Sequence, residues 1–225
     1  MHRRNALLIA SFALLTPAAL ATFVTFAIFT TFATLATFPT PVLAADAPIS
    51  FERYRLAPGA HPKFTKLVVL GISDDRELRH RFEDRFVSHL RGKDLLARTS
   101  YSLVDDLTQP VDRDRLLATL QSEGVDGVLT VRAVPLDEAA QRAWPAAWDA
   151  WLDSPTTVRA LVASTQSETQ KGAKHVGVEV TLWELGSGAR PWAARTGVYD
   201  PKQLRKVAGD LMQETIAQLH EQKLL

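Results

Sequence analysis

The sequence predicts an α/β domain with a small, mostly parallel sheet in strand-helix-strand-helix-strand order, extended by a C-terminal antiparallel hairpin and closed by a C-terminal helix. Three patterns support this class. First, an apolar run near residue 70 is followed by a helical pattern. Second, a strand pattern followed by a helical pattern occurs once more after it. Third, an alternating stretch near residue 180 and a second strand pattern are separated by a Gly-Ser-Gly turn.

Residues 66–90 give the strongest of these signals. The apolar run at residues 67–72 is typical of a strand that is covered on both faces. Asp74 and Glu77 have the spacing of a capping box, which predicts a helix start. The buried face of this helix is predicted by apolar residues that recur every four positions, Leu78, Phe82, Phe86 and Leu90.

Two more strands and one more helix complete the parallel part. Residues 98–104 form a weaker strand pattern, and residues 125–134 form a clearer one. Between them, Asp112 can cap a helix whose inward residues are Leu116, Leu117 and Leu120. With right-handed crossovers, this order gives a small parallel sheet.

Residues 135–174 interrupt the pattern and are predicted to be an insertion. Residues 143–152 are apolar, whereas residues 153–174 are rich in Ser, Thr and Gln and are expected to form a mobile flap. We expect the domain to fold without this insertion.

The C-terminal part returns to regular patterns. Residues 176–185 and 191–199 are predicted to pair as a hairpin. Asp200, with Pro201 and Gln203, has the sequence of a capped helix start. The buried stripe of this last helix is predicted to be Leu204, Val207, Leu211, Thr215 and Leu219.

The N-terminal 44 residues differ from the rest of the chain, because their only charges are Arg3 and Arg4. This composition predicts a signal peptide cleaved after Ala44, or an N-terminal membrane anchor; cleavage after Ala21 is the third alternative. Each alternative places the domain outside the cytoplasm. Residues 45–65 are predicted to be a linker and residues 66–225 a single domain.

Charge and cysteine content exclude several kinds of function. Two of the 26 basic residues and none of the 25 acidic residues lie in the first 44 positions, so the remainder carries 24 basic against 25 acidic residues. This balance argues against nucleic acid as a partner. Because the chain has no cysteine, it has no disulfide, thiolate metal site, cysteine nucleophile or lipid-bearing cysteine.

The first strand is followed by a loop at the position where open α/β sheets bind ligands, but its residues favour capping. Asp74 and Asp75 would repel a phosphate, and Ser73 lacks the elbow sequence of a nucleophile. His80 and Asp84 lie one helical turn apart, yet two ligands do not make a metal site. Glu83 and Asp84 point to different faces, and Arg79, Arg81 and Arg85 predict a solvated face. We expect neither catalytic residues nor a cofactor nor a metal.

Trp144, Trp148 and Trp151 form the clearest candidate for a binding surface. Their i, i+4, i+7 spacing places them on one side of a helix, which begins near Pro145. They either pack on their own sheet or form a docking face for an envelope protein or a membrane surface. The second interpretation makes these three residues the candidate binding site.

Several motifs together resemble an uncharacterised family of exported bacterial envelope proteins, many of them lipoproteins. The first motif is residues 71–74, followed by a helix that carries Arg79, residues 82–84 and Phe86. The other motifs are residues 125–129, residues 178–183, and residues 186–188 together with Trp192. The similarity covers about residues 64–224. It implies a fold like the periplasmic domain of the curli-secretion lipoprotein, without an established activity. This chain lacks the cysteine that accepts the lipid.

These observations lead us to expect a non-catalytic periplasmic or envelope module that binds another component or assists its assembly. The alternative is a periplasmic hydrolase or a small-ligand-binding enzyme whose site is built from residues distant in sequence. Buried ionisable groups that converge in a pocket would favour the enzyme. The oligomeric state and the identity of the partner do not follow from the sequence.

Overall fold

The structure is a computed structural model and describes residues 50–225 apart from 60, 74, 91, 93, 106, 108–109 and 165–171. The side chains of residues 110, 111, 164 and 205–207 are also outside the description. Residues 1–44, with the predicted signal peptide or anchor, lie outside the described residues. So do Asp74 and the side chain of Val207.

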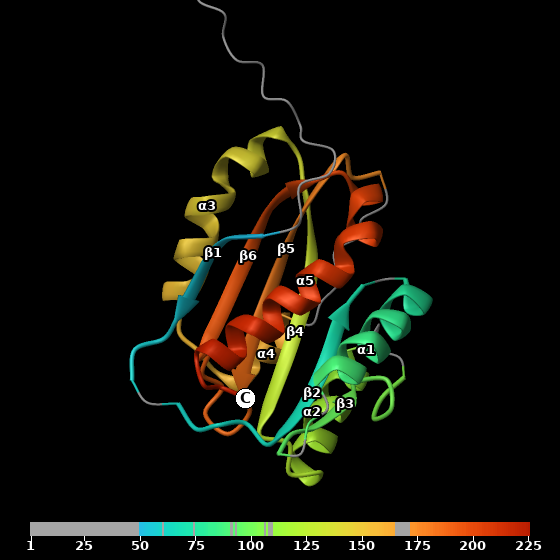
Figure 1. Cartoon of the computed structure of the whole chain (residues 1–225), viewed down its shortest axis with the longest axis vertical. Helices are drawn as coiled ribbons and strands as arrows, with labels where there is room; N and C mark the ends of the chain where they lie inside the picture. The colour runs from blue at the N-terminus through green and yellow to red at the C-terminus, as the bar shows by residue number, and fades with distance from the viewer. Residues whose placement is uncertain are drawn as a thin grey trace, which may run out of the picture. The chain divides into compact units, whose positions relative to one another are not determined.

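One sheet carries six strands in the described part of the chain, in the order β1-β6-β5-β4-β2-β3 (Figure 1). The strands are β1 (Phe51–Leu56), β2 (Lys66–Ile72), β3 (Leu96–Thr99), β4 (Gly127–Leu136), β5 (His175–Glu184) and β6 (Trp192–Tyr199). The helices are α1 (Arg76–Leu90), α2 (Pro110–Ser122), α3 (Glu138–Asp153), α4 (Val158–Ser164) and α5 (Pro201–Glu221).

The α/β class is confirmed, and so are the three parallel strands β2, β3 and β4 and the antiparallel hairpin of β5 and β6. The sheet as a whole is not mostly parallel. β2 pairs in parallel with β3 and β4, whereas the β4–β5, β5–β6 and β1–β6 pairs are antiparallel. The sheet is therefore mixed. Two antiparallel pairs were not predicted: β5 runs antiparallel beside β4, and β1, which lies within the predicted linker 45–65, runs antiparallel beside β6. Five of the six residues of β1 are exposed, so its sequence lacks the apolar run that marks the inner strands.

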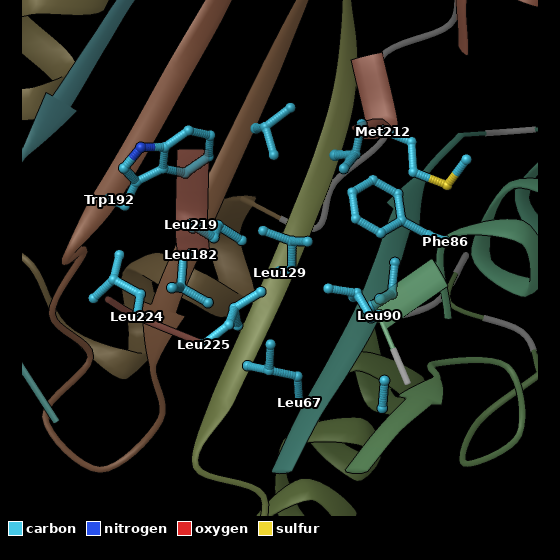
Figure 2. Packing of buried hydrophobic residues seen from close by; sticks show 14 of the residues in the cluster. Leu67, Phe86, Leu90, Leu129, Leu182, Trp192, Met212, Leu219, Leu224 and Leu225 are labelled. Carbon is cyan, nitrogen blue, oxygen red and sulfur yellow. The ribbon is translucent and has the colours of Figure 1, made fainter. Parts of the chain in front are cut away.

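Helices cover both faces of the sheet. α1 and α5 lie on the face toward the viewer in Figure 1, and α3 lies behind the sheet. The first face has a core of Leu67, Leu129 and Leu182 from the strands with Phe86, Met212 and Leu219 from the helices (Figure 2). The opposite face has a second core, which includes Val68, Val128 and Trp183 from the sheet with Leu116, Leu120 and Leu161 from α2 and α4.

The α1 helix is rotated relative to the predicted face. Phe86 and Leu90 are buried as predicted, but Leu78 is 39% exposed, and Arg79 and Glu83 are buried in its place. The predicted solvated face is thus wrong at Arg79. The Asp75 side chain accepts a hydrogen bond from the Leu78 amide at 3.0 Å, while the predicted cap, Asp74, lies outside the described residues. The expected strand at residues 98–104 is wrong beyond Thr99, because β3 spans Leu96–Thr99 and residues 100–103 form a turn.

The predicted insertion packs against the sheet. It contains α3 and α4, and Leu161 of α4 is 3% exposed in the second core. Arg190 donates hydrogen bonds to the carbonyl oxygens of Leu152 and Ser154, at 3.1 and 2.8 Å. Gly188 has a φ of +72° and lies so close to Thr157 that a Cβ would be 2.3 Å from its backbone. The described part of the segment therefore contacts the rest of the domain, while residues 165–171 of the expected mobile flap lie outside the described residues.

The C-terminal helix begins as the sequence predicts. Asp200 accepts a hydrogen bond from the Lys202 amide at 2.8 Å and forms a capping box with Gln203. Past the helix end, Leu224 and Leu225 are 2% and 8% exposed and belong to the first core. The described end of the chain is therefore part of the packed interior.

Candidate binding groove

A groove with a volume of about 1100 Å³ lies between α1 and α5. Its floor contains Val131 and Ala133 of β4 with Val178 of β5. Among the described side chains of α5, those that line the groove are apolar: Pro201, Leu204, Ala208, Leu211 and Met212. The α1 bank contains Leu78 and Phe82 together with polar and charged side chains. The groove is therefore apolar at its base and polar along one side.

Topology explains why this space remains open. α1 packs on β2 and β3, α5 packs on β5 and β6, and the two helices also contact each other, so the groove lies over β4 where they diverge. Neighbouring strands are about 4.8 Å apart, which makes a six-strand sheet wider than two helices of about 10 Å diameter. Both helices also start at the same sheet edge, because α1 follows β2 and α5 follows β6, a strand that runs parallel to β2.

The charged side of the groove is a stripe on α1. Arg81, Arg85 and His89 are four residues apart, are exposed and line the groove. Side chains at this spacing lie above one another on a helix. Arg81 forms an exposed ion pair with Glu77 one turn earlier.

Among the described residues, two acidic side chains also line the groove, and both have local partners. Asp75 caps α1 through the Leu78 amide, and Asp84 accepts a hydrogen bond from the hydroxyl of Tyr101. The outer part of the α1 bank is therefore dominated by the basic stripe.

Glu83 lies beneath this bank and is fully buried. Its Oε1 accepts hydrogen bonds from the Gly71 amide at 3.0 Å and the Ser100 hydroxyl at 2.7 Å. Its Oε2 accepts from the amides of Ser100 at 2.7 Å and Tyr101 at 3.3 Å. The Nε of Arg79 lies 3.6 Å from Oε1. This carboxylate ties α1 to the ends of β2 and β3 and so fixes one wall of the groove.

Burial raises the pKa of Glu83, while the hydrogen bonds from Ser100 and Gly71 act in the opposite direction. A buried carboxyl with a raised pKa is also the pattern of a catalytic acid. Both oxygens here are occupied by protein donors and neither is exposed, which favours a structural role. From the sequence, Glu83 was weighed only as a carboxylate partner of Asp84 and its burial was not predicted, although Glu83, Phe86, Val87 and Leu90 have the i, i+3, i+4, i+7 spacing of a buried face.

The other residues weighed for chemistry have structural contacts. The hydroxyl oxygen of Ser73 accepts a hydrogen bond from the Asp75 amide at 3.1 Å, which is the geometry of a turn serine. The ring of His80 stacks on Tyr101 at 4.0 Å, and its Nε2 lies 3.2 Å from a carboxylate oxygen of Asp105. Burial and the nearby Arg79 lower the pKa of His80. Within the described ranges, no three His, Asp or Glu side chains are grouped to hold a metal.

The predicted docking face needs correction. Trp144 and Trp148 are only 6% and 2% exposed and cover their own sheet. The Trp144 indole lies over Gly177, where a Cβ would be 2.8 Å from the ring. The half-buried Trp151 ring lies 4.1 Å from the Arg190 guanidinium. The three residues do not form a free aromatic surface, because the i, i+4, i+7 spacing is the same whether a helix face packs inward or outward.

Among the helices of the described residues, none is long and apolar enough to cross a membrane. No protein-family model matches the chain, and no curated protein matches it. The chain is similar to two solved structures of the PelC dodecamer from Paraburkholderia phytofirmans, each 16% identical. One, a point variant, has a TM-score of 0.39 over 72% of this chain and 92% of that chain; the other has 0.36 over 71% and 89%. At TM-scores below 0.5, these similarities carry no argument about function.

Proposed function

We propose that this domain is a non-catalytic binding or assembly module of the bacterial cell envelope, and that the groove between α1 and α5 is its binding site. The observation that carries this proposal is the groove itself, about 1100 Å³ in volume, with an apolar floor on β4 and β5. An apolar depression with polar groups at its edge is the usual form of a binding site.

The side chains around the groove support binding rather than catalysis. General acid–base chemistry requires an acid and a base within hydrogen-bond reach of a substrate. Among the described lining residues, Asp75 is engaged in capping and Asp84 in a hydrogen bond with Tyr101. Glu83 is buried with both oxygens bonded. A periplasmic hydrolase or small-ligand enzyme is the alternative, and turnover of a generic ester or peptide substrate that is lost on groove substitution would favour it.

The envelope location rests on the N-terminal sequence, with Arg3 and Arg4 ahead of an uncharged stretch that ends near Ala44. Residues 1–60 fused to a reporter that is active only outside the cytoplasm should give an active fusion. The matched control replaces Arg3 and Arg4 by Glu, which removes the positive flank and should reduce export. An inactive fusion of the natural sequence would contradict the location.

Site-specific crosslinking in the bacterial host tests the groove. A photoreactive residue at Leu78, which is 39% exposed on the α1 bank, should give a discrete adduct of higher mass. The control position is Leu96 on β3, which is 53% exposed and outside the groove. Ala208→Trp, which places an indole between the two banks, should abolish the Leu78 adduct. An adduct that forms equally at both positions, or that survives the Ala208 substitution, would refute the groove as the site.

A further inference from the structure

We infer that the open edge of β1 is a second interaction surface, which binds an extended segment of a partner protein as an additional strand. Apolar and acidic residues alternate in that segment. The surface lies outside the groove, so the inference goes beyond the proposed function and does not depend on it. Three features carry it: backbone groups that point away from the sheet, apolar side chains exposed beside them, and two half-exposed arginines.

The backbone of β1 offers hydrogen-bonding groups on its outer side. β1 is the outermost strand on one side of the described sheet (Figure 1). The Ala57 amide, directly after β1, donates a hydrogen bond to the Pro191 carbonyl at 2.8 Å. Because alternate residues of an antiparallel ladder point to the same side, the N–H and C=O groups of Tyr54 and Leu56 face outward. These groups are a template for another strand.

The usual protections of an edge strand are weak in β1. The strand, FERYRL, contains neither Lys nor Pro, and its bulge lies between Phe51 and Arg53, ahead of the outward-facing residues. Its three charged side chains have ion-pair partners within the chain, which are Arg195 for Glu52, Asp149 for Arg53 and Asp153 for Arg55. These ion pairs hold the charges at the rear of the sheet, so the backbone edge stays accessible.

Tyr54 and Leu56 also expose their side chains, on the face that carries the first core. Their cross-strand neighbours on β6 are Ala194 and Trp192, and both belong to that core. Tyr54 is 50% and Leu56 is 39% exposed, because α5 packs on β5 and β6 and β1 lies beyond it. An added strand would cover these two side chains with its own residues on that face, which favours apolar residues there.

Charge favours acidic residues at the alternate positions of the added strand. Arg53 and Arg55 lie on the other face of β1, and their side chains are 54% and 45% exposed. Each ion pair joins one guanidinium nitrogen, Nη1, to the carboxylate of Asp149 or Asp153 on α3. A guanidinium has five N–H donors, so a Glu or Asp of the added strand can bond each arginine from the side of the open edge.

The same arginines argue against a second copy of this chain as the occupant. Two identical strands that pair about a two-fold axis are antiparallel. An axis at Tyr54 would place Arg53 opposite Arg55 of the second copy, and an axis at Arg55 would place Arg55 opposite itself. Like charges directly opposite each other destabilise a pair of strands, so an acidic partner segment fits this edge better.

Two synthetic ten-residue peptides test the inference on the purified protein. Both have Val at alternate positions, and the positions between carry Glu in one peptide and Lys in the other. By fluorescence anisotropy, the Glu peptide should bind about tenfold more tightly than the Lys peptide, and raised salt should reduce this difference. Arg53→Gln combined with Arg55→Gln should make the two affinities equal. Equal binding of both peptides to the natural chain, or binding of neither, would overturn the inference.

A proline tests whether the peptide binds the backbone edge. Tyr54→Pro removes an N–H that faces outward, so the hydrogen bonds to β6 remain and binding of the Glu peptide should be lost. Tyr54→Val is the matched control, since it also removes the ring but keeps the N–H, and it should still bind the peptide. If Tyr54→Pro does not fold by circular dichroism, a Glu peptide N-methylated along its whole backbone takes its place and should not bind the natural chain. Binding that survives the loss of these N–H groups contradicts the inference.

Two further measurements separate this surface from the other possible occupants and from the groove. If light scattering shows that the natural chain is a dimer and Tyr54→Pro a monomer, the occupant is a second copy and the inference fails. Ala208→Trp, which blocks the groove, should leave the affinity for the Glu peptide unchanged. If Ala208→Trp abolishes peptide binding, the peptide lies in the groove and the inference fails. The Leu78 adduct is measured independently, so the proposed function stands or falls separately.

Discussion

Truncating Trp148 tests whether α3 belongs to the folded core. The side chain is 2% exposed, and its ring lies 5.8 Å from the Arg195 guanidinium. A buried tryptophan removes about 150 to 250 Å² from water, which corresponds to about 4 to 6 kcal/mol at about 25 cal/mol per Å². Alanine retains part of this area, so Trp148→Ala should lower the free energy of unfolding by about 3 to 5 kcal/mol.

Urea unfolding followed by circular dichroism measures this change, because a shift of the midpoint at constant slope reports stability alone. Arg142→Ala is the matched control, since Arg142 is exposed on the same helix and its loss should change the free energy of unfolding by less than about 0.5 kcal/mol. Trp148→Phe should lie between the two, because most of the apolar ring remains.

A loss below about 1 kcal/mol for Trp148→Ala would refute this reasoning. It would mean that α3 separates from the sheet in solution, so that the burial of its indoles does not contribute to the stability of the domain. The tryptophans would then become available again as a docking face. A large loss would instead confirm that α3 is part of the folded core.

Three further changes test other parts of the structure. Burial raises the pKa of Glu83, so the folded state disfavours the ionised carboxylate, and the contribution of Glu83 to stability falls as pH rises from the ordinary glutamate range through the raised pKa. When unfolding is measured from about pH 4 to 8, the difference in the free energy of unfolding between the natural chain and Glu83→Gln should therefore narrow as pH rises. A difference that widens with pH would contradict this. Gly177→Ala should lower the free energy of unfolding by about 1 to 3 kcal/mol and alter tryptophan fluorescence, because the added Cβ would be 2.8 Å from the Trp144 ring. The control Gly186→Ala should change neither, because a Cβ there meets no atom within 4 Å. Phe86→Ala removes a side chain with 0% exposure and should lower the free energy of unfolding by about 3 to 5 kcal/mol. EDTA should leave the urea midpoint of the natural chain unchanged, and a midpoint that falls on addition of EDTA would contradict the expectation that the domain folds without metal.

The sequence alone determined those features that depend on neighbouring residues. The α/β class follows from an apolar run before a helical pattern, and α5 starts at Asp200 because the capping residues lie within one turn of each other. The pairing of β5 with β6 follows from alternation around a short turn. The longest of these signals, residues 66–90 and 175–199, span 25 consecutive residues each, so no contact between distant parts of the chain is needed to interpret them.

Tertiary structure decided which side of each helix is buried and where the groove lies. Glu83 can be buried only because Gly71, Ser100 and Tyr101 supply donors from β2 and from the turn after β3, and that combination does not exist in the helix sequence. β1 is a strand because β6 offers its edge, although the β1 side chains are mostly exposed. The indole of Trp144 packs inward because Gly177, 33 positions away, leaves room for it. Spacing along a helix defines a stripe, but only the surface opposite decides whether that stripe is core or solvent-facing.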